Sequence, residues 1–80
     1  MQGDPLQTIR RNNLRRLIAE LRADGISQWR ALAQSLGVDP AVLDDIRTGA
    51  PIPDALAREI EWAMQRPFRW LDRASHGELA

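Results

Sequence analysis

Residues 28–49 read QWRALAQSLGVDPAVLDDIRTG, and the two helices predicted here set the architecture of the chain. Each half of this stretch places apolar side chains at the spacing of an amphipathic helix. Gly37, Val38 and Asp39 stand between the halves and leave room only for a tight turn. The small side chain of Ala33 lets the second helix cross the first closely, and Gly37 accepts left-handed backbone. The spacing therefore predicts a helix-turn-helix.

Further helices are predicted on both sides of this stretch. Asp4-Pro5 is a capped helix start, which Gln7 is expected to complete as a capping box, with Thr8 as the alternative cap. Asp24-Gly25 is a helix stop. Ser27 is expected to cap the second helix. The predicted helices span residues 5–23, 28–36, 40–48, 53–66 and 68–71. No stretch alternates as a strand does, so the fold class is all-α, a compact five-helix bundle. Residues 1–73 are expected to form this domain and residues 74–80 a flexible C-terminal tail.

The composition excludes several classes of function. The 80 residues carry 11 basic and 11 acidic side chains, every basic one an arginine, and no cysteine. No apolar run approaches the roughly 18 residues of a membrane span, and no signal peptide is evident, so we expect a cytoplasmic protein without a membrane partner. A lone His76 makes no metal site, and no serine has a base at a suggestive spacing. We therefore expect no enzyme, no cofactor and no small-molecule substrate.

Three blocks of sequence resemble the lambda-repressor-like DNA-binding domains, in particular phage-type repressors of the Xre/Cro-like kind. These blocks are IRRNNLRRLI at residues 9–18, the helix-turn-helix at residues 29–49, and ALAREIEWAMQRPFRWLD at residues 55–72. The last block is similar to a family ending in which an Ala-Arg-x-Ile-Glu helix precedes Pro-x-x-Trp-Leu/Met-Asp. The resemblance implies five helices, with the third helix in the DNA major groove and a dimer on a palindromic site.

Two groups of residues follow as candidates for contact with double-stranded DNA. With the apolar side chains of the third helix turned inward, its remaining face is expected to meet the bases. This base-facing group comprises Asp39, Ala41, Asp44, Asp45 and Thr48. The group expected at the phosphates comprises Arg10, Arg11, Arg15, Gln28 and Arg47. The arginines of the first helix have a second interpretation, as a solvated face or as partners of Glu20, Asp44 or Asp45.

Two features of these residues argue against DNA binding. Asp44 and Asp45 would approach the phosphates, where each repulsion is about 2–3 kcal/mol at about 6 Å and an effective dielectric near 20. A carboxylate can accept a hydrogen bond from cytosine, but two adjacent ones are hard to justify. Trp29 stands where the family often has glutamine. Its aromatic ring is expected to pack on the first helix rather than to contact a phosphate.

The aromatic side chains near the end of the chain are candidates for a protein interface. Trp62 falls outside the apolar stripe of the fourth helix, which suits an interface anchor. Phe68 and Trp70 are expected to close the core over that helix, with a dimer contact as the alternative. The chain is therefore predicted to be a sequence-specific DNA-binding transcriptional regulator. The alternative is an interaction or oligomerisation module, bound to a protein partner or to a second copy, that has lost DNA binding.

Overall fold

The computed structural model describes residues 4–74. All of the regular secondary structure in these residues is helical. They form four α-helices, α1 (Pro5–Ala23), α2 (Trp29–Leu36), α3 (Pro40–Arg47) and α4 (Asp54–Ala63), followed by a 3₁₀ turn, η1 (Trp70–Asp72). The all-α prediction is confirmed. The predicted fifth helix is wrong in kind, because Arg69 takes a left-handed backbone with φ of 68° and only one 3₁₀ turn follows it. No helix within residues 4–74 is long and apolar enough to cross a membrane.

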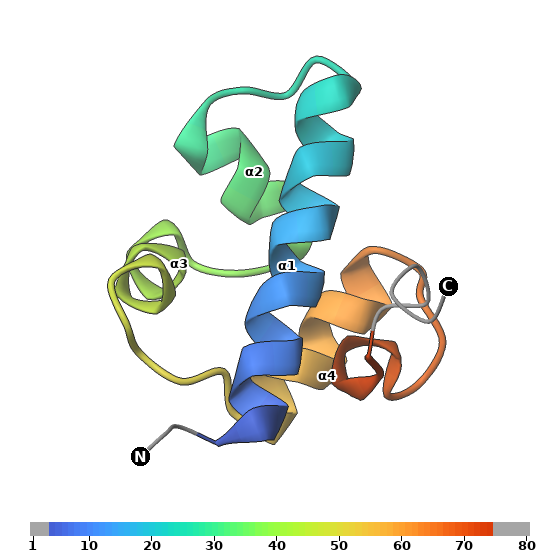
Figure 1. Ribbon diagram of the computed structural model, residues 1–80. Coiled ribbons are helices and arrows are strands. Elements are labelled where there is room, and N and C mark those ends of the chain that lie inside the picture. Colours follow the sequence, from blue (N-terminus) through green and yellow to red (C-terminus); the bar gives the residue numbers. More distant parts are fainter. Residues whose placement is uncertain (1–3, 75–80) are drawn as a thin grey trace.

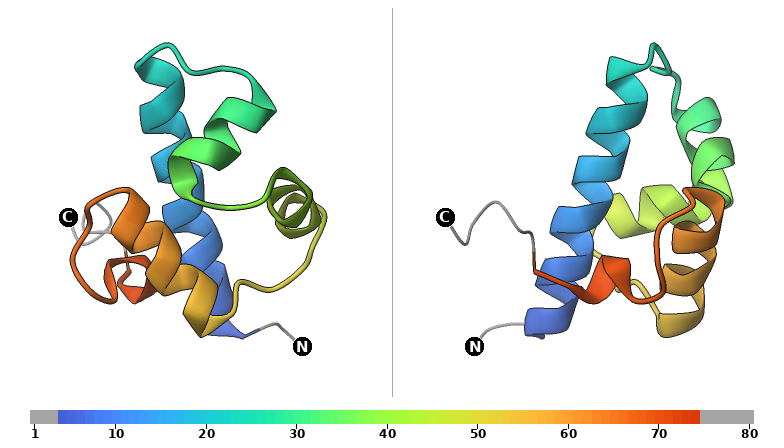
Figure 2. Two further views of the ribbon diagram at one scale, coloured as in Figure 1. Left: turned by 180° about the vertical axis from the view of Figure 1, so that it is seen from behind. Right: turned by 90° about the vertical axis from the view of Figure 1, so that its right-hand side faces the viewer.

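Helix α1 is the longest element and contacts η1, while α2 contacts both α3 and α4. Figure 1 shows α2 and α3 on one side of α1, with α4 and η1 on the other side. The second view of Figure 2 shows α1 along one edge of the molecule, with η1 against its N-terminal half. The final described turn of the chain thus returns to the helix with which the fold begins.

The core is made of aliphatic side chains from every element. Leu17 of α1, Leu32 of α2, Ile60 of α4 and Leu71 of η1 are completely buried, and Leu43 of α3 is 1% exposed. Because α2 and α3 have eight residues each, neither is long enough to be stable alone, and both depend on this burial.

The ends of the helices mostly follow the sequence signals. The carboxylates of Asp4 and Asp39 each accept a backbone N–H two residues later, from Leu6 at 2.9 Å and from Ala41 at 2.8 Å. Gly25 and Gly37 adopt positive φ after α1 and α2.

Two predicted caps are wrong. Gln28 rather than Ser27 is the N-cap residue of α2, and no side chain of residues 4–74 caps that helix. Gln7 makes no capping box at the start of α1. Its amide instead clamps the backbone of Ile52, donating to the carbonyl at 3.0 Å and accepting from the N–H at 2.7 Å. Of the predicted tail at residues 74–80, only Ala74 is among the described residues, and His76 lies outside them.

Candidate functional site

The outward face of α3 carries the side chains predicted to meet DNA bases. Ala41, Asp45 and Thr48 are exposed there, and the face is not covered by any other element within residues 4–74. Asp39 is exposed as well, but its carboxylate is engaged as the N-cap of α3. The hydroxyl of Thr48 donates to the carbonyls of Asp44 and Asp45, both at 3.1 Å, which closes the last turn of the helix.

Asp44 differs from Asp45 because an arginine neutralises it. Arg47 donates to Oδ1 of Asp44 through Nε at 3.0 Å and Nη2 at 2.6 Å. Its guanidinium also stacks at 5.8 Å from the centroid of the Trp29 ring. The side chains of Arg47 and Asp44 are 59% and 51% exposed, so the pair lies at the surface. The acidic charge of this face is thus lower than the two adjacent aspartates suggest.

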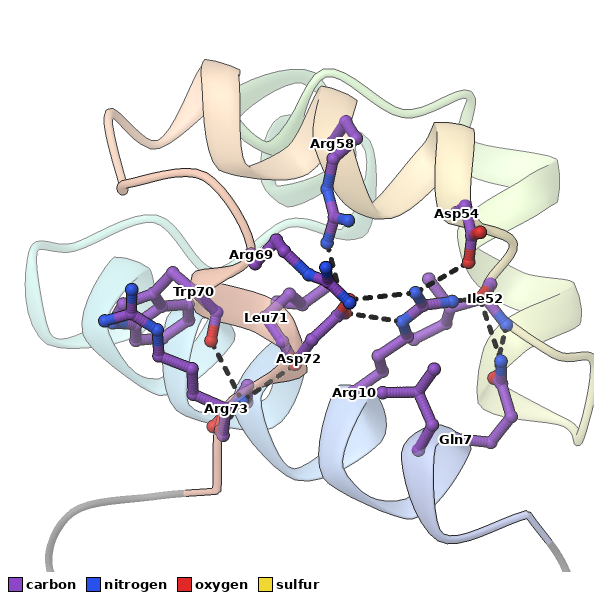
Figure 3. Close-up of polar contacts among 12 residues, drawn as sticks. Gln7, Arg10, Ile52, Asp54, Arg58, Arg69, Trp70, Leu71, Asp72 and Arg73 are labelled. Atoms are coloured by element: carbon purple, nitrogen blue, oxygen red, sulfur yellow. Dashed lines mark hydrogen bonds and ion pairs between the residues drawn. The ribbon is translucent and has the colours of Figure 1, made fainter.

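Arg10, predicted as a phosphate contact, is instead a core residue, and that prediction is corrected. Only 2% of Arg10 is exposed. Its guanidinium holds Asp72 through Nε at 2.7 Å and Nη2 at 3.1 Å, the carbonyl of Ile52 at 2.7 Å, and Asp54 at 2.7 Å. Figure 3 shows Arg10 between these partners, with Gln7 beside it at Ile52. A side chain enclosed in this way has no face left for DNA.

The other predicted phosphate contacts lie on α1, directly before α2 and on α3. Arg11 is half-buried and donates to the last carbonyls around α3, those of Ile46 at 2.6 Å and Ala50 at 2.5 Å. The carbonyl of Ile46 also accepts the backbone N–H of Gly49 at 3.1 Å, so Arg11 adds to the bonds that close the end of α3. Arg15 is exposed and donates to Asn12 at 3.3 Å, and Gln28 is exposed ahead of α2.

A groove of about 210 Å³ separates α1 from α3 beside the start of α2. Its apolar lining consists of Leu14, Ile18, Trp29, Leu43 and Ile46. Its basic lining consists of Arg11, Arg15, Arg22 and Arg47. The structure thus brings three of the predicted phosphate contacts, Arg11, Arg15 and Arg47, to one place. We call this feature the α1–α3 groove.

Two exposed residues of α2 lie beside α3 and were not predicted from the sequence. Arg30 and Gln34 line one shallow depression together with Asp39 and Ala41 of the base-facing group. Both are exposed. A four-residue spacing places them on one face of a helix, opposite its buried Leu32, so the helical wheel of α2 would have found them.

A buried polar network near η1 was not predicted either. The carboxylate of Glu61, 2% exposed, accepts two bonds from Arg58 at 2.9 Å and the backbone N–H groups of Arg69 at 3.0 Å and Leu71 at 2.8 Å. Asn13, equally buried, donates to the carbonyls of Leu71 at 2.9 Å and Arg73 at 2.7 Å. These side chains fix the last described turn on α1 and α4.

The charges of this network stabilise one another. Hydrogen bonds from Arg10, followed by one from Arg58, hold the pKa of Asp72 below its usual range, although burial opposes the shift. The same pairing, with Asp72 first and Asp54 second, raises the pKa of Arg10 further above its already high value. Both groups stay charged at neutral pH. Their bonds join η1 and the start of α4 to α1, so the network holds these elements together.

The three candidate interface aromatics lie in different environments. Trp62 on α4 is 83% exposed. Phe68 is 70% exposed, with the guanidinium of Arg58 at 5.1 Å from its ring centroid, so the prediction that Phe68 closes the core is wrong. Trp70 is half-buried and packs against the core beneath the guanidinium of Arg66, at 5.1 Å, as predicted.

Neither a cluster of metal ligands in residues 4–74 nor a similar known protein is found that would indicate a function. Within residues 4–74, no three His, Asp or Glu side chains gather as metal ligands would. Comparison of the chain with protein-family models, with curated proteins and with solved structures finds no match. Function must therefore be inferred from the arrangement of the side chains themselves.

Proposed function

We propose that the protein is a sequence-specific DNA-binding regulator of transcription, in which α2, the turn at residues 37–39 and α3 act as a helix-turn-helix. The observation that carries the proposal is the exposed face of α3. The helix is anchored by buried Leu43 and Ile46, while Ala41, Asp45 and Thr48 point away from the core. This division of faces is what a helix needs to enter a major groove.

The surroundings of α3 add support from three sources. Arg47 offsets the charge of Asp44, which removes one of the two repulsions expected at the phosphates. Arg30 and Gln34 lie beside Ala41, where they can contact the DNA backbone. The resemblance to lambda-repressor-like domains points the same way and implies a dimer on a palindromic site. Asp45 then remains as the carboxylate available to accept from cytosine.

Selection from a pool of random duplexes at low salt tests this proposal. We expect enrichment of a site and a steep decrease in affinity as salt is raised. Asp45→Asn should strengthen non-specific binding, because it removes a negative charge that faces the phosphates. Glu59→Gln is the matched control, since Glu59 is an exposed acid on α4. Absence of any duplex binding at low salt contradicts the proposal, as does an equal response to the two variants.

Arg30→Gln gives an independent test of the orientation. If Arg30 pairs with a phosphate, removing its charge lowers affinity for all sequences alike and reduces the salt slope by about 1. Arg73→Gln removes an exposed arginine at the far end of the described chain and should leave the slope unchanged. If Arg30→Gln leaves affinity and slope unchanged, α2 does not lie against DNA.

An interaction or oligomerisation module is the second candidate, and the exposed indole of Trp62 favours it. Tryptophan side chains are seldom this exposed, at 83%, and tryptophan is a common anchor at protein interfaces. Sedimentation of the protein and of Trp62→Ala tests this function. A self-associating protein that becomes monomeric in the variant supports it, while a protein that is monomeric over the whole concentration range excludes self-association through α4.

A further inference from the structure

We propose that the α1–α3 groove binds an acidic peptide segment of a partner protein. The peptide would place one apolar side chain in the groove, and the acidic residues on either side of it would pair with the arginines. This binding site goes beyond the proposed DNA-binding function and does not rest on it. The groove combines an apolar floor with an arginine rim, and each selects a different part of the peptide.

The floor of the groove is the open edge of the core. Leu14, Leu43 and Ile46 are almost fully buried, while Ile18 and Trp29 are half-buried and pack only partly against other side chains. An apolar group placed here would complete their packing and would itself be removed from water, which is favourable. The volume of about 210 Å³ is below the roughly 300–1,000 Å³ of pockets that enclose a whole small molecule, but it admits one large side chain.

The rim of the groove selects acidic neighbours for that side chain. Four arginines line the groove, and its lining includes no carboxylate from residues 4–74. Arg11 and Arg15 donate to uncharged oxygens, those of backbone carbonyls and of Asn12, so their positive charges are not neutralised by these bonds. Arg47 shares its charge with Asp44 at the far wall. Carboxylates that flank an anchor would pair with the planar guanidinium forks.

The two properties together favour a peptide over DNA. A phosphate backbone would pair with the arginines but would leave the apolar floor empty. A peptide with one aromatic or large aliphatic residue between Asp and Glu satisfies both the floor and the rim. Arg30 and Asp45, which test DNA binding, are not among the lining residues of the groove. The two activities can therefore be separated by substitution.

Titration of the whole protein with three short peptides tests the site. The probe is acetyl-Glu-Asp-Phe-Asp-Glu-amide, and the matched peptides replace its Phe by Ala or its acids by Lys. Binding is followed by NMR through the indole N–H signals of the three tryptophans, with that of Trp29 assigned by Trp29→Phe. We expect the probe at millimolar concentration to shift the Trp29 signal while leaving that of exposed Trp62 in place. An absent shift overturns the proposal, and so does an equal shift with the Ala peptide.

Substitution of the rim arginines completes the test. Arg15→Gln combined with Arg22→Gln should weaken the probe by about five- to tenfold, because two exposed ion pairs are removed. Both residues are exposed on α1, and the spectrum itself reports whether the variant is folded. Arg30→Gln should weaken DNA binding without affecting the probe. Unchanged probe affinity in the α1 variant overturns the proposal, whereas a failure of DNA binding alone leaves it intact.

Discussion

Arg10 lies where an arginine is rarely found, inside the core and bonded along its whole guanidinium. Burying such a charge is costly unless every N–H group finds a partner. Here Asp72 takes two of the bonds, and Ile52 and Asp54 take the others. These partners come from the segment before α4, from the start of α4 and from η1. A single side chain thus joins three segments of the chain to α1.

Replacing Arg10 by Met should therefore destabilise the protein strongly. The variant keeps an apolar stem but leaves the buried carboxylate of Asp72 with Arg58 as its main partner, and breaking a buried pair costs about 3–5 kcal/mol. Urea denaturation measures the free energy of unfolding. Arg15→Gln on the exposed face of the same helix is the control, with a change within about 0.5 kcal/mol. Equal losses in the two variants would contradict the structural role of Arg10.

The ionisation of Asp72 makes stability depend on pH. Because its pKa is lower in the folded chain than in the unfolded chain, the unfolded chain takes up the proton first as the pH falls. The stabilisation is complete above the ordinary carboxyl pKa and is lost from about pH 5 downward. In Asp72→Asn the slope of unfolding free energy against pH should decrease by up to about 1.4 kcal/mol per unit in this acidic range. Denaturation at a series of pH values measures both slopes, and identical slopes would refute this assignment.

At the scale of the elements, α3 is a short helix held from both ends by other parts of the chain. Asp39 caps its first turn, and Arg11 from α1 donates to the carbonyl of Ile46 in its last turn and to that of Ala50 just beyond it. Positive charge at a helix C-terminus is also favourable to the helix dipole. The exposed face of α3 is therefore presented on a fixed helix, which any sequence-specific contact requires.

The turn between α2 and α3 should tolerate nothing but glycine at position 37. Gly37 has φ of 72°, and a Cβ built there would lie 3.1 Å from the Cβ of Ala63 on α4. Gly37→Ala should lose about 1–3 kcal/mol of stability through backbone strain, and more through this contact. Gly25→Ala shares the strain, with φ of 98°, but meets no described atom within 4 Å. Ala63→Gly removes the contact, so Gly37→Ala should destabilise the Ala63→Gly background less than it destabilises the original chain. Thermal unfolding of Gly37→Ala, Gly25→Ala, Ala63→Gly and the double variant measures this, and an equal loss in both backgrounds would contradict the role of the contact.

At the scale of the whole molecule, local signals predicted the helices well. The Asp-Pro starts at residues 4 and 39 and the glycines at 25 and 37 act through neighbours a few residues away, so they can be read from sequence. The 3₁₀ turn at residues 70–72 could not be predicted in this way. Glu61 and Asn13 bond to the backbone of this segment, and Arg69 takes a left-handed conformation there instead of continuing a helix. Such bonds depend on distant parts of the chain.

The candidate site was predictable only in part, for the same reason. The exposed positions of α3 follow from the helical period, which needs only the apolar pattern. The burial of Arg10 depends on Asp72, which is 62 residues away in sequence. The pairing of Asp44 with Arg47 is local, at three residues, and a helical wheel could have found it. The α1–α3 groove combines residues of three helices and required their packing.

Leu71 tests whether the molecule unfolds as one unit. It is completely buried and lies in the last described turn, whereas Phe68 is 70% exposed in the same segment. Leu71→Ala should lower the free energy of unfolding by about 2–5 kcal/mol, and Phe68→Ala by much less. Because η1 contacts α1 and α4 while Trp29 lies at the start of α2, the loss at Leu71 must reach Trp29 through the shared core. Circular dichroism and the NMR signal of Trp29 should therefore report the same lowered midpoint in urea. Two separate midpoints would show instead that the helices around the groove unfold independently of the end of the chain.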